Sequence, residues 1–230
     1  MTPKEVYDVL KKIGAQHLHH ANTVTTSCTF LEHGALLSRG YVESHGLKQT
    51  PQDSDAIDKK YGIWDCVFLD HVDIHYRGGR AKGPNQYGPV LFVFELNVLL
   101  GLPRGTDVRV TKMNPTRWTN RQKDEDRWYL SADELAKSIG YGDFDKMLVI
   151  TTPSGKVDFP GGPVRIALDD PNRKMSTGAD AYRHAEQRLK AASQKGKITI
   201  NITPHQCRDG CICVATYKSY NIPYFDSRFA

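Results

Sequence analysis

The sequence lacks any apolar run long enough to cross a membrane. Of its 230 residues 39% are hydrophobic and 25% are charged, but no stretch approaches the roughly 20 consecutive apolar residues of a membrane helix. The opening MTPKEVYDVLKK has the pattern of an amphipathic helix and lacks the apolar centre of a signal peptide. Internal repeats and low-complexity tracts are also absent. We therefore expect a soluble cytoplasmic protein, large enough for one sizeable domain or two small ones.

Cysteine is scarce, and neither charge sign dominates. Five cysteines is an odd count, which favours free thiols or metal ligands over a disulfide framework. The net charge of +5 is mildly basic. It is compatible with a nucleic-acid partner without identifying one.

Short helices are interspersed among many strands. Apolar periodicity and capping residues predict helices over 3–14, 23–33, 131–140 and 179–196. Residues 43–60 are polar and predict irregular chain. The expected strands are HLHHA, IWDCVFLD, PVLFVFELNVLL, VRVTK, KMLVITT, PVRIAL, KITINIT and CICVATY. Because strands and helices do not alternate regularly, the pattern predicts an α+β fold in a single domain rather than a doubly wound sheet.

Histidines crowd the first expected strand. Alternation places His17 and His19 on one face and His20 on the other. Each also fits an ordinary surface or core position, and their spacing is not that of a zinc site. A helix follows them and ends at Gly34, a residue typical of a helix C-terminus. Two leucines, Ser38 and Arg39 come next.

This order of strand, helix and glycine turn resembles the ADP-ribosyltransferase superfamily, especially its poly(ADP-ribose)-polymerase-like group and the DarT toxins that modify nucleic acids. DCVFLDHVDIHYR resembles the second motif of that superfamily, YGPVLFVFELNVLLG its next apolar strand, and DKMLVIT the strand that bears the catalytic glutamate. The resemblance covers residues 17–152. It implies split antiparallel β-sheets with short flanking helices in one domain, residues 1–230. In that domain 17–152 form the NAD-binding core and 153–230 a C-terminal extension.

The resemblance also implies the contacts to NAD, the substrate of that superfamily. The first-strand histidine that bonds a ribose falls on His20, and the backbone that holds the nicotinamide amide falls on Ala21 and Asn22. An aromatic ring stacks on the nicotinamide, for which Tyr76 fits best and Phe68 second, although both also fit ordinary packing. The remaining candidates, for the turn and for a basic contact to the diphosphate, are Ser38, Arg39, Lys59 and Lys60.

The catalytic glutamate of the resemblance is missing. Asp145 or Lys146 occupies its position, and a lysine ammonium cannot accept a hydrogen bond from a ribose hydroxyl. Asp145 and Asp158 are the candidates to replace it, with Tyr76 beside them in the catalytic set. Glu95 is a further alternative, because a carboxylate within an apolar strand is unusual.

A basic segment with interleaved aromatic residues spans 103–129. It holds seven Lys and Arg against four Asp and Glu, together with Trp118 and Trp128. Arginine binds phosphates, and an indole face stacks on an unpaired base. We expect contacts to single-stranded nucleic acid from Arg117, Trp118 and Arg121. The alternative is an exposed loop with one tryptophan anchored in the core.

The C-terminal PHQCRDGCICVATY suggests a metal site. Three thiols and one imidazole are an ordinary zinc ligand set, although an alternating strand would leave its cysteines in a core. Asp70, His71, Asp73 and His75 are a second group of metal-ligand types. The expected zinc ligands are His205, Cys207, Cys211 and Cys213.

Three hypotheses follow. The first is an NAD-dependent ADP-ribosyltransferase that modifies single-stranded RNA or DNA as a toxin or phage-defence effector, with an antitoxin protein as a possible partner. The second is a metal-dependent nuclease or a zinc-stabilised nucleic-acid-binding protein. The third is a non-enzymatic protein whose NAD fold has decayed, with Lys146 in place of the acid.

Overall fold

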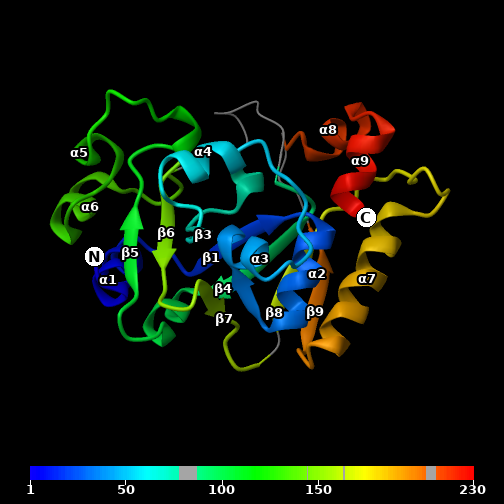
Figure 1. Ribbon diagram of the computed structural model, residues 1–230, viewed down its shortest axis with the longest axis horizontal. Helices are drawn as coiled ribbons and strands as arrows, with labels where there is room; N and C mark the ends of the chain where they lie inside the picture. The colour runs from blue at the N-terminus through cyan, green and yellow to red at the C-terminus, as the bar shows by residue number, and fades with distance from the viewer. Residues whose placement is uncertain (78–86, 144, 163, 206–210) are drawn as a thin grey trace.

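The protein is one α+β domain built on a mixed seven-stranded sheet (Figure 1), which confirms the predicted fold class. The computed structural model describes residues 1–77, 87–143, 145–162, 164–205 and 211–230. The strand order is β5-β6-β3-β1-β4-β8-β9, and β2 and β7 form a separate small sheet. The strands are β1 His17–Asn22, β2 Ala35–Leu37, β3 Val67–Asp70, β4 Val90–Glu95, β5 Asp107–Val110, β6 Met147–Thr151, β7 Lys156–Asp158, β8 Val164–Leu168 and β9 Ile200–Pro204.

Strand pairing is antiparallel except for β8 and β9, which are parallel. Parallel neighbours need a crossover connection, and the helix α7 (Ala181–Lys195) provides it. The resemblance implied split antiparallel β-sheets, and the parallel pairing of β8 with β9 departs from that expectation. Strand β4 lies between β1 and β8, as its continuous apolar sequence predicts. The strand ends at Glu95, and the chain continues as the 3-10 helix η2 (Leu96–Gly101).

Capping residues in the sequence mark the termini of the first two helices. In α1 (Pro3–Lys12), Thr2 and Glu5 form a reciprocal capping box. Helix α2 (Val24–His33) begins after Thr23, whose hydroxyl accepts from the Thr26 amide, and it ends at Gly34 with φ 65°. A left-handed residue of this kind favours glycine. Four short helical segments are η1 Ile74–Arg77, η3 Pro115–Arg117, α5 Asp124–Arg127 and α6 Ala132–Ser138.

Two predicted segments fold differently. Residues 43–60 were expected to be irregular, but helix α3 (Arg39–Ser44) runs into this span and α4 (Asp55–Lys60) lies within it. The alternating CICVATY forms helix α8 (Cys213–Ser219), followed by α9 (Ile222–Phe229), and not a strand. Its buried residues Cys213, Thr216 and Tyr217 are spaced three and four apart, so they share one helix face. The same segment therefore fits both a helical spacing and the two-residue alternation that predicted a strand.

The two faces of the central sheet have different environments. Helix α2 packs along α7, and α9 contacts both, covering one face (Figure 1). Leu18, Phe92 and Ile166 are buried in the main core. His17 and His19 line a groove with Arg165 instead, so the strand's alternation separates them from His20 as predicted. Among the described residues, none of the helices combines the length and apolarity required for a membrane span.

Candidate active site

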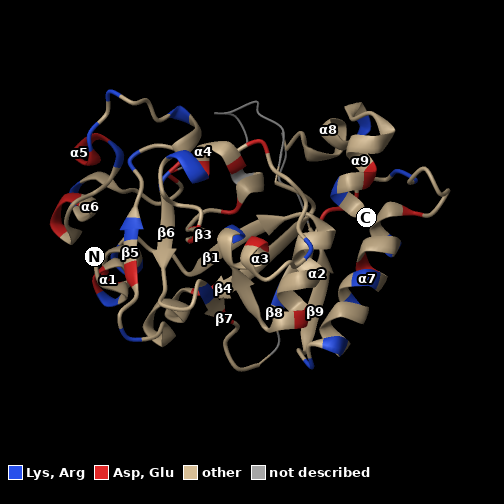
Figure 2. Ribbon diagram, viewed as in Figure 1, with Lys and Arg blue, Asp and Glu red and all other residues tan. Residues whose placement is uncertain are grey.

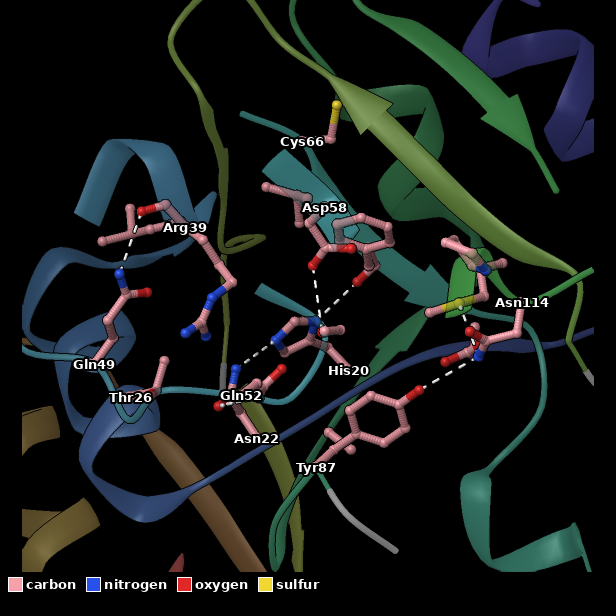
Figure 3. A pocket seen from close by; sticks show the side chains of 18 of the residues that line it. His20, Asn22, Thr26, Arg39, Gln49, Gln52, Asp58, Cys66, Tyr87 and Asn114 are labelled. Atoms are coloured by element: carbon pink, nitrogen blue, oxygen red, sulfur yellow. Dashed lines mark hydrogen bonds between the residues drawn. The ribbon is translucent and has the colours of Figure 1, made fainter. Parts of the chain in front are cut away.

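A cavity with about 820 Å³ of empty space, its open mouth included, lies where β1, α2, α3, α4 and β3 meet. Its far wall is made by Tyr87, the segment 114–116 and Met147 at the start of β6 (Figure 3). Five of the residues that the sequence assigns to NAD line this one cavity: His20, Ala21, Asn22, Arg39 and Phe68.

His20 is held as a neutral imidazole in one tautomer. Its Nδ1 lies 2.8 Å from the carbonyl oxygen of Phe68, which can only accept, so Nδ1 carries the proton. The Asn22 amide nitrogen lies 3.2 Å from Nε2 and donates to its lone pair. Burial lowers the pKa of His20 to about 4, the carbonyl bond opposes this, and the charge of Arg39 adds to the lowering. The imidazole therefore presents no charge to the cavity at neutral pH.

The side chain of Asn22 is fixed from several sides. Its Oδ1 accepts from the backbone amide of Thr23 at 2.9 Å and from the amide of Gln52 at 3.3 Å. Asn22 is 5% exposed, so these bonds replace water. The amides of Asn22 and Gln52 both line the cavity, where they offer oriented polar groups to a ligand.

Arg39 supplies the positive charge of the cavity. Its Nε lies 2.7 Å from one carboxylate oxygen of Asp55 and its NH2 2.7 Å from the other. NH2 also donates to the Thr50 carbonyl at 3.0 Å. The guanidinium of Arg39 is thus preorganised on the cavity wall. A planar guanidinium of this kind suits a phosphate oxygen pair.

Asp58 is a cavity carboxyl group that the sequence reading missed. It lies in α4, is 7% exposed and accepts a hydrogen bond from Ser54 Oγ at 3.4 Å. Burial raises the pKa of Asp58 to about 6, against the Ser54 bond that lowers it. A carboxyl group that titrates near neutral pH inside a cleft is a candidate acid or base. The sequence signal was weak, because Asp58 lies in the polar run DSDAIDKK, whose charged residues also fit an ordinary solvent-exposed segment.

Asn114 is another cavity residue that the sequence did not indicate. Its Nδ2 donates to the Tyr87 hydroxyl at 3.4 Å and lies 3.8 Å from the sulfur of Met147. This joins the far wall of the cavity to the start of β6. No motif marks Asn114, since its partners lie in separate parts of the chain.

The carboxylates that the sequence offered in place of the catalytic glutamate do not line this cavity, whereas Asp70, proposed as a metal ligand, does. Asp145 lies two residues before Met147. It has φ 72° and forms an ion pair with Arg117. Asp158 ends β7 in the small sheet and pairs with Lys156 at 3.0 Å. Glu95 is 60% exposed and pairs with Arg165 at 3.0 Å.

The other predicted NAD contacts also lie elsewhere. Ser38 is buried and caps α3, its hydroxyl accepting from the Tyr41 amide at 3.1 Å. Lys59 pairs with Glu43 at 2.7 Å. Tyr76 lies in η1, and its side chain is outside the described part of the chain.

The basic segment starts at the cavity and then divides. Pro115 and Thr116 line the cavity, and Arg117 follows them with 58% of its side chain exposed. Trp118 is 6% exposed and packs edge-on against Trp128, with the ring centroids 4.8 Å apart. Its rings are therefore part of a small second core. Arg121 is exposed. Figure 2 shows Lys and Arg mixed with acidic residues at the end of the molecule that carries α5.

The predicted zinc ligands are not brought together among the described residues. The ligand atoms of His205 lie near those of Asp73 and His75, whereas Cys213 lies near His75 and Asp169. Cys211 belongs to neither group, and Cys207 is outside the described residues. Cys211 and Cys213 are not on one strand face as predicted, because helix α8 begins at Cys213.

No protein-family model matches the chain, and no curated protein matches it. Among solved structures, the chain is similar to Thermus sp. 2.9 DarT in complex with ADP-ribosylated ssDNA, at 12% identity and a TM-score of 0.45. The match covers 82% of this chain and 94% of that chain. A likeness of this degree carries no weight for function, which rests here on the cavity and its residues.

Proposed function

We propose that the protein is an NAD-dependent ADP-ribosyltransferase, a glycosyltransferase that moves ADP-ribose onto a nucleic acid. The observation that carries the proposal is the shared cavity of His20, Asn22 and Arg39, which the sequence motifs assign separately to one cofactor. A neutral imidazole and side-chain amides suit ribose hydroxyls and a carboxamide, and the guanidinium suits a diphosphate. This supports residues 17–152 as the NAD-binding core.

In the proposed reaction, the bond between the nicotinamide nitrogen and the ribose C1′ breaks. Nicotinamide leaves as a neutral molecule with both electrons of that bond, and an acceptor heteroatom bonds to C1′. The sugar is oxocarbenium-like between these events, so positioning of the two riboses supplies much of the acceleration. The acceptor's proton must pass to a base.

We assign that base to Asp58. Its pKa of about 6 leaves it ionised at neutral pH and able to take a proton. Its negative charge also stabilises the positive charge that develops on the sugar. Asp145 is the second candidate, because it lies close to Met147 at the cavity wall and is paired with Arg117.

The proposed acceptor is a single strand of RNA or DNA. The segment that lines the cavity at Pro115 and Thr116 continues directly into exposed Arg117 and Arg121, which suit backbone phosphates. Such a modification would block replication or translation. We therefore propose a toxin or phage-defence role in the cytoplasm, where NAD and nucleic acid meet, with an antitoxin protein as its natural partner.

The test is mass spectrometry of single-stranded RNA and DNA oligonucleotides after incubation with the protein and NAD. We expect a mass gain of one ADP-ribose unit, lost in His20→Ala and in Asp58→Asn. His19→Ala is the matched control, because His19 lies on the same strand but lines the groove on the other sheet face. Its activity should equal that of the unmodified protein.

Two other readings predict different results. A nuclease would shorten the oligonucleotides without NAD and would need a metal; the group Asp73, His75 and His205 favours that reading. A decayed, non-enzymatic fold would give neither adduct nor nicotinamide release. Absence of both products with every acceptor would overturn the transferase proposal.

A further inference from the structure

A buried chain of polar side chains lies apart from the cavity. His205 Nε2 is 2.8 Å from Asp73 Oδ2, and the other oxygen of Asp73 is 2.8 Å from His75 Nδ1. The Tyr217 hydroxyl donates to Asp169 Oδ2 at 2.5 Å. His75 and Asp169 are 4% and 2% exposed, so the cost of removing these groups from water must be offset within the protein.

The two inner atoms of this chain form a close, buried ion pair. His75 Nε2 and Asp169 Oδ1 lie 2.8 Å apart, but their geometry falls short of an aligned hydrogen bond. The oxygen therefore lies away from the direction of the N–H bond. A buried imidazole nitrogen and a buried carboxylate oxygen placed in this way can both bind a metal ion that lies between them.

Cys213 completes a three-ligand set with them. Its sulfur, His75 Nε2 and a carboxylate oxygen of Asp169 all lie within 4.8 Å of one another, and all three residues are buried. Zinc bonds of about 2.0 to 2.3 Å place tetrahedral ligand atoms roughly 3.4 to 3.6 Å apart. The His75–Asp169 pair would have to open by roughly half an ångström to admit the ion.

The surrounding residues match the outer shell of a zinc site. Histidine ligands of zinc usually donate their second ring nitrogen to a carboxylate, and His75 Nδ1 has Asp73 in that position. The second oxygen of Asp169 is held by Tyr217. Thiolate, imidazole and carboxylate together favour Zn²⁺ over the hard cations Mg²⁺ and Ca²⁺, which prefer oxygen ligands only.

We propose that His75, Asp169 and Cys213 bind a zinc ion through three protein ligands, and that this ion fastens helix α8 to the end of β8. The ligand set differs from the one expected from the sequence, since it takes one residue from each of three distant segments. Binding releases the protons held by the imidazole and the thiol. The site is separate from the cavity, so its test is independent of the transferase proposal.

The test uses the full chain purified without a polyhistidine tag. Elemental analysis should find about one zinc per folded chain. Replacement by Co²⁺ should give a sulfur-to-cobalt charge-transfer band in the near ultraviolet. That band should vanish in Cys213→Ser and persist in Cys28→Ser, a buried cysteine elsewhere in the core. Asp73→Asn should weaken zinc binding about 10- to 100-fold.

Each opposite result overturns the proposal. A wild-type chain that holds no zinc after growth with zinc and gives no cobalt band would show that a proton alone joins His75 to Asp169. Bound metal whose band persists in Cys213→Ser would show that other residues hold it. The wild-type cobalt spectrum needs no variant, so the test stands even if Cys213→Ser does not fold, which circular dichroism would reveal.

Discussion

Substitution of Asp58 by Asn should make the protein more stable at neutral pH while removing its proposed activity. Burial raises the pKa of Asp58 from 3.8 to about 6. The folded state therefore binds the carboxyl proton of Asp58 more tightly than the unfolded state does. Protonation of Asp58 stabilises the fold fully below pH 3.8, and this stabilisation is lost as the pH rises through the folded-state pKa. Ionised Asp58 thus costs the folded protein about 3 kcal/mol above pH 6, since each unit corresponds to about 1.4 kcal/mol.

Asparagine keeps the shape of Asp58 but cannot ionise. The free energy of unfolding, measured in urea for both proteins, should therefore favour Asp58→Asn by about 1.4 kcal/mol more at pH 8 than at pH 5. Asp53 is exposed and nearby, and Asp53→Asn should leave this difference unchanged. If the two proteins differ in free energy of unfolding by the same amount at pH 5 and pH 8, the raised pKa of Asp58 is refuted. Full transfer activity in Asp58→Asn would refute its assignment as the base.

Three further substitutions test the cavity and the core. Arg39→Lys should weaken NAD binding about tenfold or more by calorimetry, because lysine cannot reproduce the planar two-point geometry held by Asp55; unchanged affinity would place the diphosphate elsewhere. Gly88→Ala should lower the free energy of unfolding by about 2 to 4 kcal/mol, since Gly88 has φ 132° and its Cβ would lie 2.5 Å from the Asn22 backbone. A Tm equal to wild type would contradict that contact. Trp118→Ala should cost about 3 to 5 kcal/mol in chemical denaturation, and a loss below about 1 kcal/mol would mean that its rings are not core.

Local signals in the sequence predicted the parts of the site that lie on one short segment. Strand alternation separates His20 from His19, and the Thr23 cap and Gly34 fix α2 immediately after them. The alternation and the caps depend on neighbours a few residues apart, which a sequence displays directly. The superfamily resemblance, not a local signal, implied that the start of β6 meets the site, and Met147 there lines the cavity.

Partners from distant segments could not be predicted in this way. His20 bonds the Phe68 carbonyl across a separation of 48 residues. Whether a carboxylate is buried enough to titrate near neutral pH depends on what folds over it, and this singled out Asp58 rather than Asp145 or Asp158. Burial likewise placed Trp118 in a core, although a tryptophan between arginines reads equally well as a stacking surface.

The sequence by itself determined the α+β class, the helix caps and the side of the sheet on which His17, His19 and His20 lie, because propensity, capping and two-residue alternation are local. The tertiary structure alone decided which polar groups share a cavity or a buried cluster. His75, Asp169 and Cys213 meet only because the end of β8 and the start of α8 pack beside η1. Burial and charge pairing depend on three-dimensional neighbours, and these set the chemistry of both sites.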